Sequence, residues 1–177
     1  AYTGTYFPDL ERRGERFAYL YRRSLREVTA VVLDVGRELR LSRFQPRACE
    51  LSFAQDGVLP PVQVDTPRGS GRVSGFVDRV DVYETDTACY YRVVDYKTGR
   101  KDFDYAEILC GEGLQMLIYL FALRKYGPAR YGKPLIPAGV LYVPGRADME
   151  RIDPGEDPAR AQAMWQKKKR RKGLVLD

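Results

Sequence analysis

An aspartate and a lysine close an apolar segment near the middle of the sequence. Asp95 and Lys97 lie two residues apart in the stretch VVDYKTG, so both side chains would lie on one face of a strand. A second aspartate, Asp78, lies in the earlier stretch GFVDRVD. Carboxylates and an amine with this spacing can bind a cation and position a water, or they can form simple ion pairs.

The pattern around these residues predicts an antiparallel hairpin. Residues 72–83 alternate in polarity and residues 89–97 return as a strand, with ETDTA as the turn between them. A two- or four-residue turn pairs residues whose numbers sum to 173, which places Asp78 opposite Asp95. Opposed residues have Cβ atoms roughly 4.5–5.5 Å apart. Strict alternation puts the side chain of Asp78 on one face with three apolar residues, Phe76, Val80 and Val82.

Two carboxylates this close on an apolar face repel each other and lose hydration. A divalent cation resolves the conflict, because Asp78 and Asp95 can each supply an oxygen. A backbone carbonyl near Tyr96 can supply a third ligand, and water completes the coordination that Mg²⁺ favours. Lys97 then lies beside a metal-bound water, which it holds or helps to deprotonate. A site of this kind can attack a phosphodiester.

The same spacing also fits a structural role, which the sequence alone leaves open. In that alternative Asp78 pairs with Arg79 or Arg92, and Lys97 is simply exposed. An exposed ion pair contributes only about 0–1 kcal/mol to stability, so it explains little about why these residues occur together.

Three further polar residues are candidates for the same site. Glu50 interrupts an apolar strand predicted at residues 46–54, and it can be a metal ligand or the partner of an arginine. Gln115 and Tyr119 are one turn apart on a helix predicted at residues 111–127. Their pattern alone also fits the polar boundary of a helix and a half-buried tyrosine.

The composition excludes several classes of chemistry. The 177 residues include no histidine, which excludes Ser-His-Asp and Cys-His nucleophiles and histidine-ligated metals. Three cysteines without a CxxC motif predict neither a disulfide framework nor a structural zinc site, and a reducing cytoplasm is the default. No apolar run approaches the roughly 18 residues that span a bilayer. No dinucleotide-binding or P-loop motif supports a small-molecule enzyme.

The net charge of +6 comes from one segment, KKKRRK. A basic run can bind DNA phosphates, or it can be the solvated end of a helix whose dipole favours cations. The residues in question are Lys167, Lys168, Lys169, Arg170, Arg171 and Lys172.

The elements around the hairpin predict a single α/β domain over residues 1–177. Strand 89–97, helix 111–126 and strand 138–143 would form a βαβ unit, so the central sheet is mixed and flanked by helices. The remaining parts are a helix at 9–41 capped by Asp9, a core at 46–143 with a short strand at 62–65, and a basic helix and final strand within 157–177.

Taken together, these motifs resemble the RecB-type nuclease module of the PD-(D/E)xK superfamily, and most closely the AddB-type nuclease domains of bacterial AddAB helicase–nucleases. The resemblance rests on GFVDRVD, VVDYKTG and LQMLIYL in this order, and FQPRACELSF, PAGVLYVP and KGLVLD also fit. It implies a restriction-endonuclease-like core and an exonuclease that cuts DNA with Mg²⁺ or Mn²⁺. It further implies a bacterial cytoplasmic complex with a helicase subunit that processes double-strand breaks for recombinational repair.

By matching position, the resemblance implies a role for each candidate residue. Asp78 and Asp95 would be metal ligands, and Lys97 would be the catalytic lysine. Gln115 and Tyr119 would line the DNA-facing side of the site.

The resemblance also has limits. Glu50 matches the acid of the family's first core strand, with a role that the match leaves open. The family's histidine-bearing upstream helix and iron–sulfur cysteines have no counterpart in this chain, so we expect a piece of a larger subunit without the cluster. Such a piece can be weakly active or inactive. The alternative function is a non-catalytic module that binds DNA or docks the helicase subunit.

Overall fold

A mixed five-stranded sheet forms the centre of the chain. The computed structural model describes residues 14–99, 103–145, 157, 159–160, 163 and 170–176. The strands follow the order β1-β4-β5-β6-β7, and only β5 and β6 run parallel among the described strands of this sheet. Their bounds are β1 Gln45–Phe53, β4 Gly75–Glu84, β5 Cys89–Lys97, β6 Leu135–Pro144 and β7 Lys172–Val175. The predicted mixed sheet with its parallel pair is therefore confirmed.

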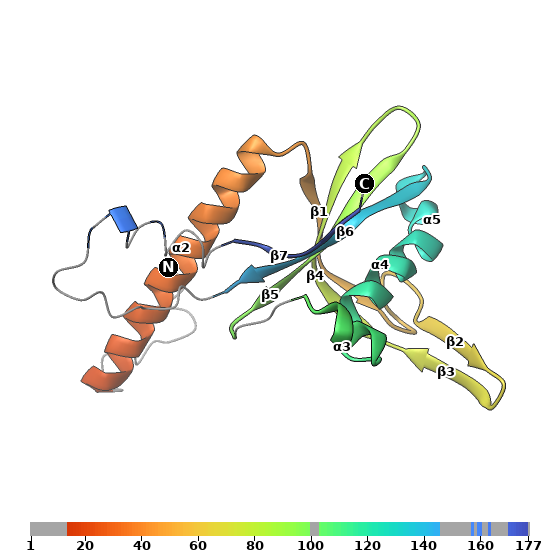
Figure 1. The fold of residues 1–177 in the computed structure, drawn as a ribbon, viewed down its shortest axis with the longest axis horizontal. Helices are drawn as coiled ribbons and strands as arrows, with labels where there is room; N and C mark the ends of the chain where they lie inside the picture. The colour runs from red at the N-terminus through yellow and green to blue at the C-terminus, as the bar shows by residue number, and fades with distance from the viewer. Residues whose placement is uncertain are drawn as a thin grey trace.

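Helices cover both faces of this sheet (Figure 1). The main core lies under α4, where Met116, Leu120 and Leu123 pack with Tyr91 and Val93 of β5. On the other face Val35 of α2 packs against Val94 and Val143. The helices are α2 Glu15–Leu41, α3 Tyr105–Leu109, α4 Gln115–Tyr126 and α5 Pro128–Tyr131.

The predicted hairpin register is confirmed over residues 79–84 and 89–94, while the predicted opposition of Asp78 and Asp95 lies one residue beyond the last paired positions. Val82 pairs with Tyr91 and Val80 pairs with Val93, as a turn at ETDTA requires. The predicted strand at 72–83 is two strands, however. The first part belongs to β3 Gly69–Val73, which pairs with β2 Val62–Thr66 in a separate two-stranded sheet. This ribbon extends away from the main sheet (Figure 1).

Two helices begin later than the sequence pattern predicts. The predicted helix at 9–41 begins at Glu15, because Gly14 has a non-helical backbone with φ of 81°. The predicted cap, Asp9, lies outside the described residues. The predicted helix at 111–127 begins at Gln115, because Gly111 and Gly113 have φ of 86° and 64°. Glycine adopts such left-handed backbone without the steric cost that other residues incur.

The end of the chain is described only in part. Most of the basic helix predicted within residues 157–177 lies outside the described residues, but β7 begins at Lys172, so the helix does not include that residue. The predicted closing strand is confirmed as β7, which pairs antiparallel with β6. No helix in the described parts of the chain is long and apolar enough to cross a membrane.

Candidate functional site

The candidate site lies where the hairpin pairing ends. The last paired positions of β4 and β5 are Arg79 and Val94. Asp78 and Asp95 are the next residues on the two strands beyond this pair. The Oδ2 atom of Asp78 then accepts a hydrogen bond of 2.8 Å from the backbone N–H of Tyr96. The Asp78 carboxylate thereby connects the two strands where their ladder stops, and both aspartates lie at the same end of the hairpin.

The alternation of β4 changes phase at Asp78. Val77 and Val80 belong to the same buried cluster, although strict alternation would place them on opposite faces. Phe76, which strict alternation places with Val80, is instead 59% exposed. The predicted shared face of Phe76 and Val80 is therefore wrong, because the in-and-out alternation of β4 shifts by one residue between Val77 and Val80.

Glu50 lies at the corresponding irregularity of the neighbouring strand. Leu51 pairs with Val77 and Cys49 pairs with Arg79, so Glu50 is opposite Asp78. Its backbone has φ of 50°, a left-handed conformation that few residues other than glycine adopt. The Glu50 side chain is exposed. Neighbouring strands β1, β4 and β5 thus bring Glu50, Asp78 and Asp95 to one row of the sheet. Of these three side chains, that of Glu50 is exposed to solvent.

Asp95 and Lys97 contact each other. The Nζ atom of Lys97 lies 2.6 Å from Oδ2 of Asp95, and the side chains are 34% and 8% exposed, respectively. Lys97 also lies over the ring of Tyr142, with Nζ 5.9 Å from the ring centroid. The predicted structural alternative, a pair of Asp78 with a neighbouring arginine, is not seen: Arg79 and Arg92 bind Asp81 instead.

The Asp95 carboxylate is buried and incompletely satisfied. Burial raises the pKa of Asp95, the contact with Lys97 lowers it, and the charge of Asp78 raises it again, so that the net shift is upward. Lys97 lies at ion-pair distance from Oδ2, yet within the described chain this buried oxygen has no partner in hydrogen-bond geometry. A carboxylate with these properties is suited to bind a cation.

The described residues provide two carboxylates for a cation rather than three. No group of three or more His, Cys, Asp or Glu side chains lies close enough to hold a metal ion in the part of the chain that the structure describes. Asp78 and Asp95 fit the sparse ligation that Mg²⁺ accepts, where water and a backbone carbonyl such as that of Tyr96 supply the other ligands. The exposed Glu50 carboxylate is not placed with them.

Tyr119 lies against Gly75, the first residue of β4, and Gln115 is hydrogen-bonded to Tyr119. Nε2 of Gln115 donates a 3.0 Å hydrogen bond to the Tyr119 hydroxyl, and the Tyr119 ring stacks on Phe53 at 5.7 Å between centroids. A Cβ atom at Gly75 would overlap the Tyr119 hydroxyl. Gly75 therefore allows the tyrosine to approach β4 three residues before Asp78. This role of Gly75 was not predicted from the sequence, although the glycine of GFVD was its signal.

The basic segment divides into several environments. Lys167, Lys168 and Lys169 lie outside the described residues, Arg170 is exposed, and Lys172 begins β7. Arg171 forms ion pairs of 2.9 Å with Glu38 and 3.0 Å with Asp34, both on α2. At least one of these cations is therefore bound to acidic residues of this chain.

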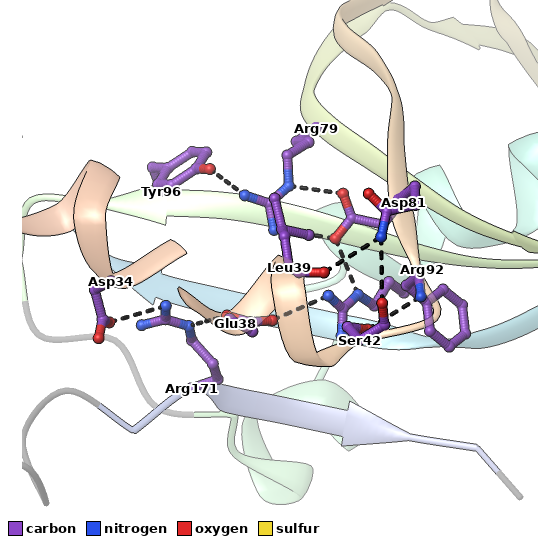
Figure 2. Close-up of polar contacts among 11 residues, drawn as sticks. Asp34, Glu38, Leu39, Ser42, Arg79, Asp81, Arg92, Tyr96 and Arg171 are labelled. Carbon is purple, nitrogen blue, oxygen red and sulfur yellow. Dashed lines mark hydrogen bonds and ion pairs between the residues drawn. The ribbon is translucent and has the colours of Figure 1, made fainter. Parts of the chain in front are cut away.

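A second group of charged residues lies on the α2 face of the same hairpin (Figure 2). Asp81 is completely buried and accepts three hydrogen bonds of 2.8–3.0 Å from Arg79 and Arg92. Arg92 continues to Glu38 at 3.0 Å, and Arg79 donates a hydrogen bond to the hydroxyl of Tyr96. This network was not predicted from the sequence. Its signal was the pair Arg79 and Asp81, two residues apart in a strand and thus on one face.

The chain is similar to known nucleases over nearly its whole length. Residues 5–174 match the PD-(D/E)XK nuclease superfamily. A protein named as a subunit of an ATP-dependent helicase/deoxyribonuclease from Ruminiclostridium cellulolyticum is 34% identical over 163 residues, which are 92% of this chain and 14% of that protein. Proteins of the same name from Symbiobacterium thermophilum and Geobacillus kaustophilus are 36% and 37% identical, over 90% and 72% of this chain. These alignments span only 14% and 11% of those two relatives.

Proposed function

This chain belongs to the PD-(D/E)XK nuclease superfamily, and we propose that it is a deoxyribonuclease domain that uses a divalent metal ion to hydrolyse phosphodiester bonds. Superfamily membership supports nuclease chemistry, and these nucleases generally use divalent metals. The name shared by the relatives includes a deoxyribonuclease, which supports DNA as the substrate. Mg²⁺ is the ion that we propose, with Mn²⁺ as a substitute.

The observation that carries the proposal is the buried carboxylate of Asp95 beside Asp78: the pKa of Asp95 is raised although Nζ of Lys97 lies 2.6 Å from its Oδ2 atom. Two acidic side chains at one end of a hairpin destabilise each other unless a cation neutralises them. Asp78, Asp95 and the backbone carbonyl of Tyr96 would hold the ion. A divalent ion supplies Lewis-acid charge stabilisation of the phosphoryl oxygens and lowers the pKa of bound water.

Lys97 is the residue that we assign to the attacking water. Its ammonium group contacts Asp95 and is 34% exposed at the side-chain level, so it can turn toward a water without movement of the backbone. There it would donate a hydrogen bond that orients the water lone pair toward phosphorus. The ring of Tyr142 beneath Nζ limits the directions that the side chain can take.

Gln115 and Tyr119 would form the DNA-facing wall at the start of β4. Their mutual hydrogen bond leaves the second N–H of the Gln115 amide as a donor for a phosphate or a base edge. The basic segment 167–172 is a further proposed DNA contact, in which Arg170 and Lys172 are exposed. Phosphate contacts of this kind contribute affinity without sequence preference.

We propose the wider role from the relatives' name. An ATP-dependent helicase/deoxyribonuclease combines unwinding with cutting, so a nuclease domain of this kind would act beside a helicase subunit. Processing of double-strand breaks for recombinational repair in the bacterial cytoplasm is the corresponding pathway. The chain spans about one seventh or less of the first relatives, so these statements concern a longer polypeptide.

The test is cleavage of linear DNA by the full-length polypeptide in Mg²⁺ or Mn²⁺. We expect Lys97→Met to lower kcat by roughly 100-fold or more, the scale of a lost acid–base or water-positioning group. The matched control is Lys133→Met, because Lys133 also pairs with an acid, Glu84 at 2.7 Å, but at the other end of the sheet. Calorimetry should show Mn²⁺ binding by the parent and its loss in Asp95→Asn.

A different outcome would favour the non-catalytic alternative. The two-carboxylate site and the direct contact of Lys97 with Asp95 also fit a nuclease-like module that binds DNA or docks a helicase subunit. That function predicts DNA binding without Mn²⁺ binding, and equal behaviour of the Lys97→Met and Lys133→Met variants.

A further inference from the structure

The segment that carries Asp95 and Lys97 is held differently on its two sides. On one side, β5 pairs with β6 as far as Lys97 and Pro144. On the other side, the pairing with β4 within the described chain ends at Arg79 and Val94. The last three residues of β5 therefore need another connection to β4 if their side chains are to keep a fixed direction.

Tyr96 makes that connection twice. Its backbone N–H donates to Oδ2 of Asp78 at 2.8 Å, and its hydroxyl accepts a hydrogen bond from Nη1 of Arg79. The guanidinium of Arg79 also lies over the Tyr96 ring, 5.5 Å from its centroid. Asp78 and Arg79 are consecutive residues of β4, so Tyr96 is fixed to β4 through both its backbone and its side chain.

Arg79 can act as a fixed anchor because its own position is determined. It is 4% exposed, and Asp81 accepts hydrogen bonds from its Nε at 2.8 Å and its Nη2 at 3.0 Å. A bidentate arginine–carboxylate pair restricts the guanidinium in both position and plane. Arg92 holds the other side of Asp81, with Nε 3.0 Å from Oδ2. Figure 2 shows this connected series from Tyr96 to Asp81 and Arg92.

From this arrangement we infer that Tyr96 and Arg79 are positioning residues of the candidate nuclease site. Successive side chains of a strand point to opposite faces, so rotation of Tyr96 about the strand would turn Asp95 and Lys97 together. The contact between Tyr96 and Arg79 on the α2 face thus fixes the direction of the Asp95 and Lys97 side chains on the α4 face. The inference rests on the proposed function, because it assigns the positioning to a metal-dependent cut.

The sharpest variant is Tyr96→Phe, which removes the hydroxyl and keeps the ring. The matched control is Tyr83→Phe. Tyr83 lies in the same hairpin, its hydroxyl accepts from Nη1 of Arg43 at 3.1 Å, and the Arg43 guanidinium lies 4.6 Å from its ring centroid. The two variants thus remove the same kind of arginine–tyrosine hydrogen bond, one beside the candidate site and one distant from it.

Three measurements on the full-length polypeptide test the inference. Hydrogen exchange of the Tyr96 amide should be faster in Tyr96→Phe and unchanged in Tyr83→Phe. Mn²⁺ affinity by calorimetry should fall by roughly tenfold in Tyr96→Phe, the lower end of the range for partners of metal ligands. The kcat for DNA cleavage should fall by a similar factor, with KM for DNA unchanged. Tyr83→Phe should match the parent in Mn²⁺ affinity and in kcat.

The outcomes separate the two proposals. If the parent binds Mn²⁺ and cuts DNA while Tyr96→Phe matches Tyr83→Phe in exchange, affinity and kcat, the inference is overturned and the proposed function stands. If the parent neither binds Mn²⁺ nor cuts DNA, the proposed function is overturned and the inference falls with it. An equal loss in both variants would indicate general destabilisation and would also overturn the inference.

Discussion

Asp81 and Asp95 are buried carboxylates of one hairpin, and they differ in how their charge is compensated. Asp81 accepts three hydrogen bonds from two arginines on the α2 face. Asp95, on the α4 face, has one lysine at ion-pair distance, and burial together with the charge of a second carboxylate, Asp78, raises its pKa. Burial of a charge is costly unless it is paired and hydrogen-bonded. Asp81 meets this requirement in full, whereas Asp95 is paired with Lys97 and still has a raised pKa.

This difference separates a structural acid from a candidate catalytic one. A fully satisfied carboxylate has no capacity for another ligand, whereas an unsatisfied one retains affinity for a cation or a proton. Functional sites commonly keep charge arrangements that are unfavourable for the empty protein. We therefore expect the same substitution, Asp to Asn, to have opposite effects on stability at the two positions.

The largest expected effect is that of Asp81→Asn. Loss of this charge leaves Arg79 and Arg92 facing each other in a buried environment, which should lower the free energy of unfolding by about 3–5 kcal/mol. Urea denaturation of the chain, followed by circular dichroism, measures the change. The control is Asp86→Asn in the exposed hairpin turn, which should stay within about 0.5 kcal/mol of the parent. A loss at Asp81 no larger than that of the control would refute the structural role.

Gly75→Ala should have the next largest effect on stability. The packing on the α4 face depends on the fit between side chains, whereas the network on the α2 face depends on charge. The added methyl overlaps the Tyr119 hydroxyl, and overpacking of this kind typically costs about 1–3 kcal/mol. The control is Gly71→Ala, since a Cβ at Gly71 would contact nothing within 4 Å. The cost of Gly75→Ala should shrink in a Tyr119→Phe background, which removes the overlapping atom. An unchanged cost would show that the hydroxyl is not the cause.

The hairpin was predictable because local rules determine it. The ETDTA turn and the alternating valines were sufficient to establish the register that brings Asp78 and Asp95 to one end. The long helix was predictable because apolar residues recur every three or four positions along it. Two of these residues, Leu25 and Val28, are nevertheless more than half exposed. A period identifies an apolar face but does not show how far the sheet beneath that face extends.

The phase change at Asp78 and the Asp81 network were not predictable from the same rules. Strict alternation assigns Val77 and Val80 to opposite faces, and it does not reveal the left-handed backbone of Glu50, which lies beside the phase change in the neighbouring strand. The network joins residues from distant parts of the chain, such as Glu38 and Arg171. Such contacts depend on the tertiary arrangement, which a pattern within one strand does not contain.

Asp95→Asn tests the other half of the comparison. The raised pKa of Asp95 means that its contribution to stability is greatest below the ordinary carboxyl pKa of 3.8 and is lost as pH rises through the folded value. At neutral pH we therefore expect the variant to be more stable than the parent, by less than the loss at Asp81. The difference between variant and parent should vanish as pH falls to the ordinary carboxyl range.

Added Mn²⁺ should reverse this order at neutral pH. Binding to the native state stabilises the parent by mass action, and the variant lacks the carboxylate that would bind the ion. Denaturation curves at pH 7 with and without Mn²⁺ measure both effects. A parent more stable than the variant in the absence of Mn²⁺ would show that Lys97 fully compensates Asp95, and the contrast with Asp81 would then be wrong.

The smallest effect is expected at the outer end of the network, where the pairs reach solvent. Asp34 binds Nη2 of Arg171 at 3.0 Å, but its side chain is 29% exposed, whereas that of Asp81 is fully buried. Water and salt weaken partly exposed pairs, so Asp34→Asn should lower the free energy of unfolding by less than about 1 kcal/mol. Denaturation in low and high salt should show this loss shrinking with ionic strength, while the loss in Asp81→Asn should change little because buried pairs are screened less. Equal losses at Asp34 and Asp81 would mean that burial does not set the strength of these pairs.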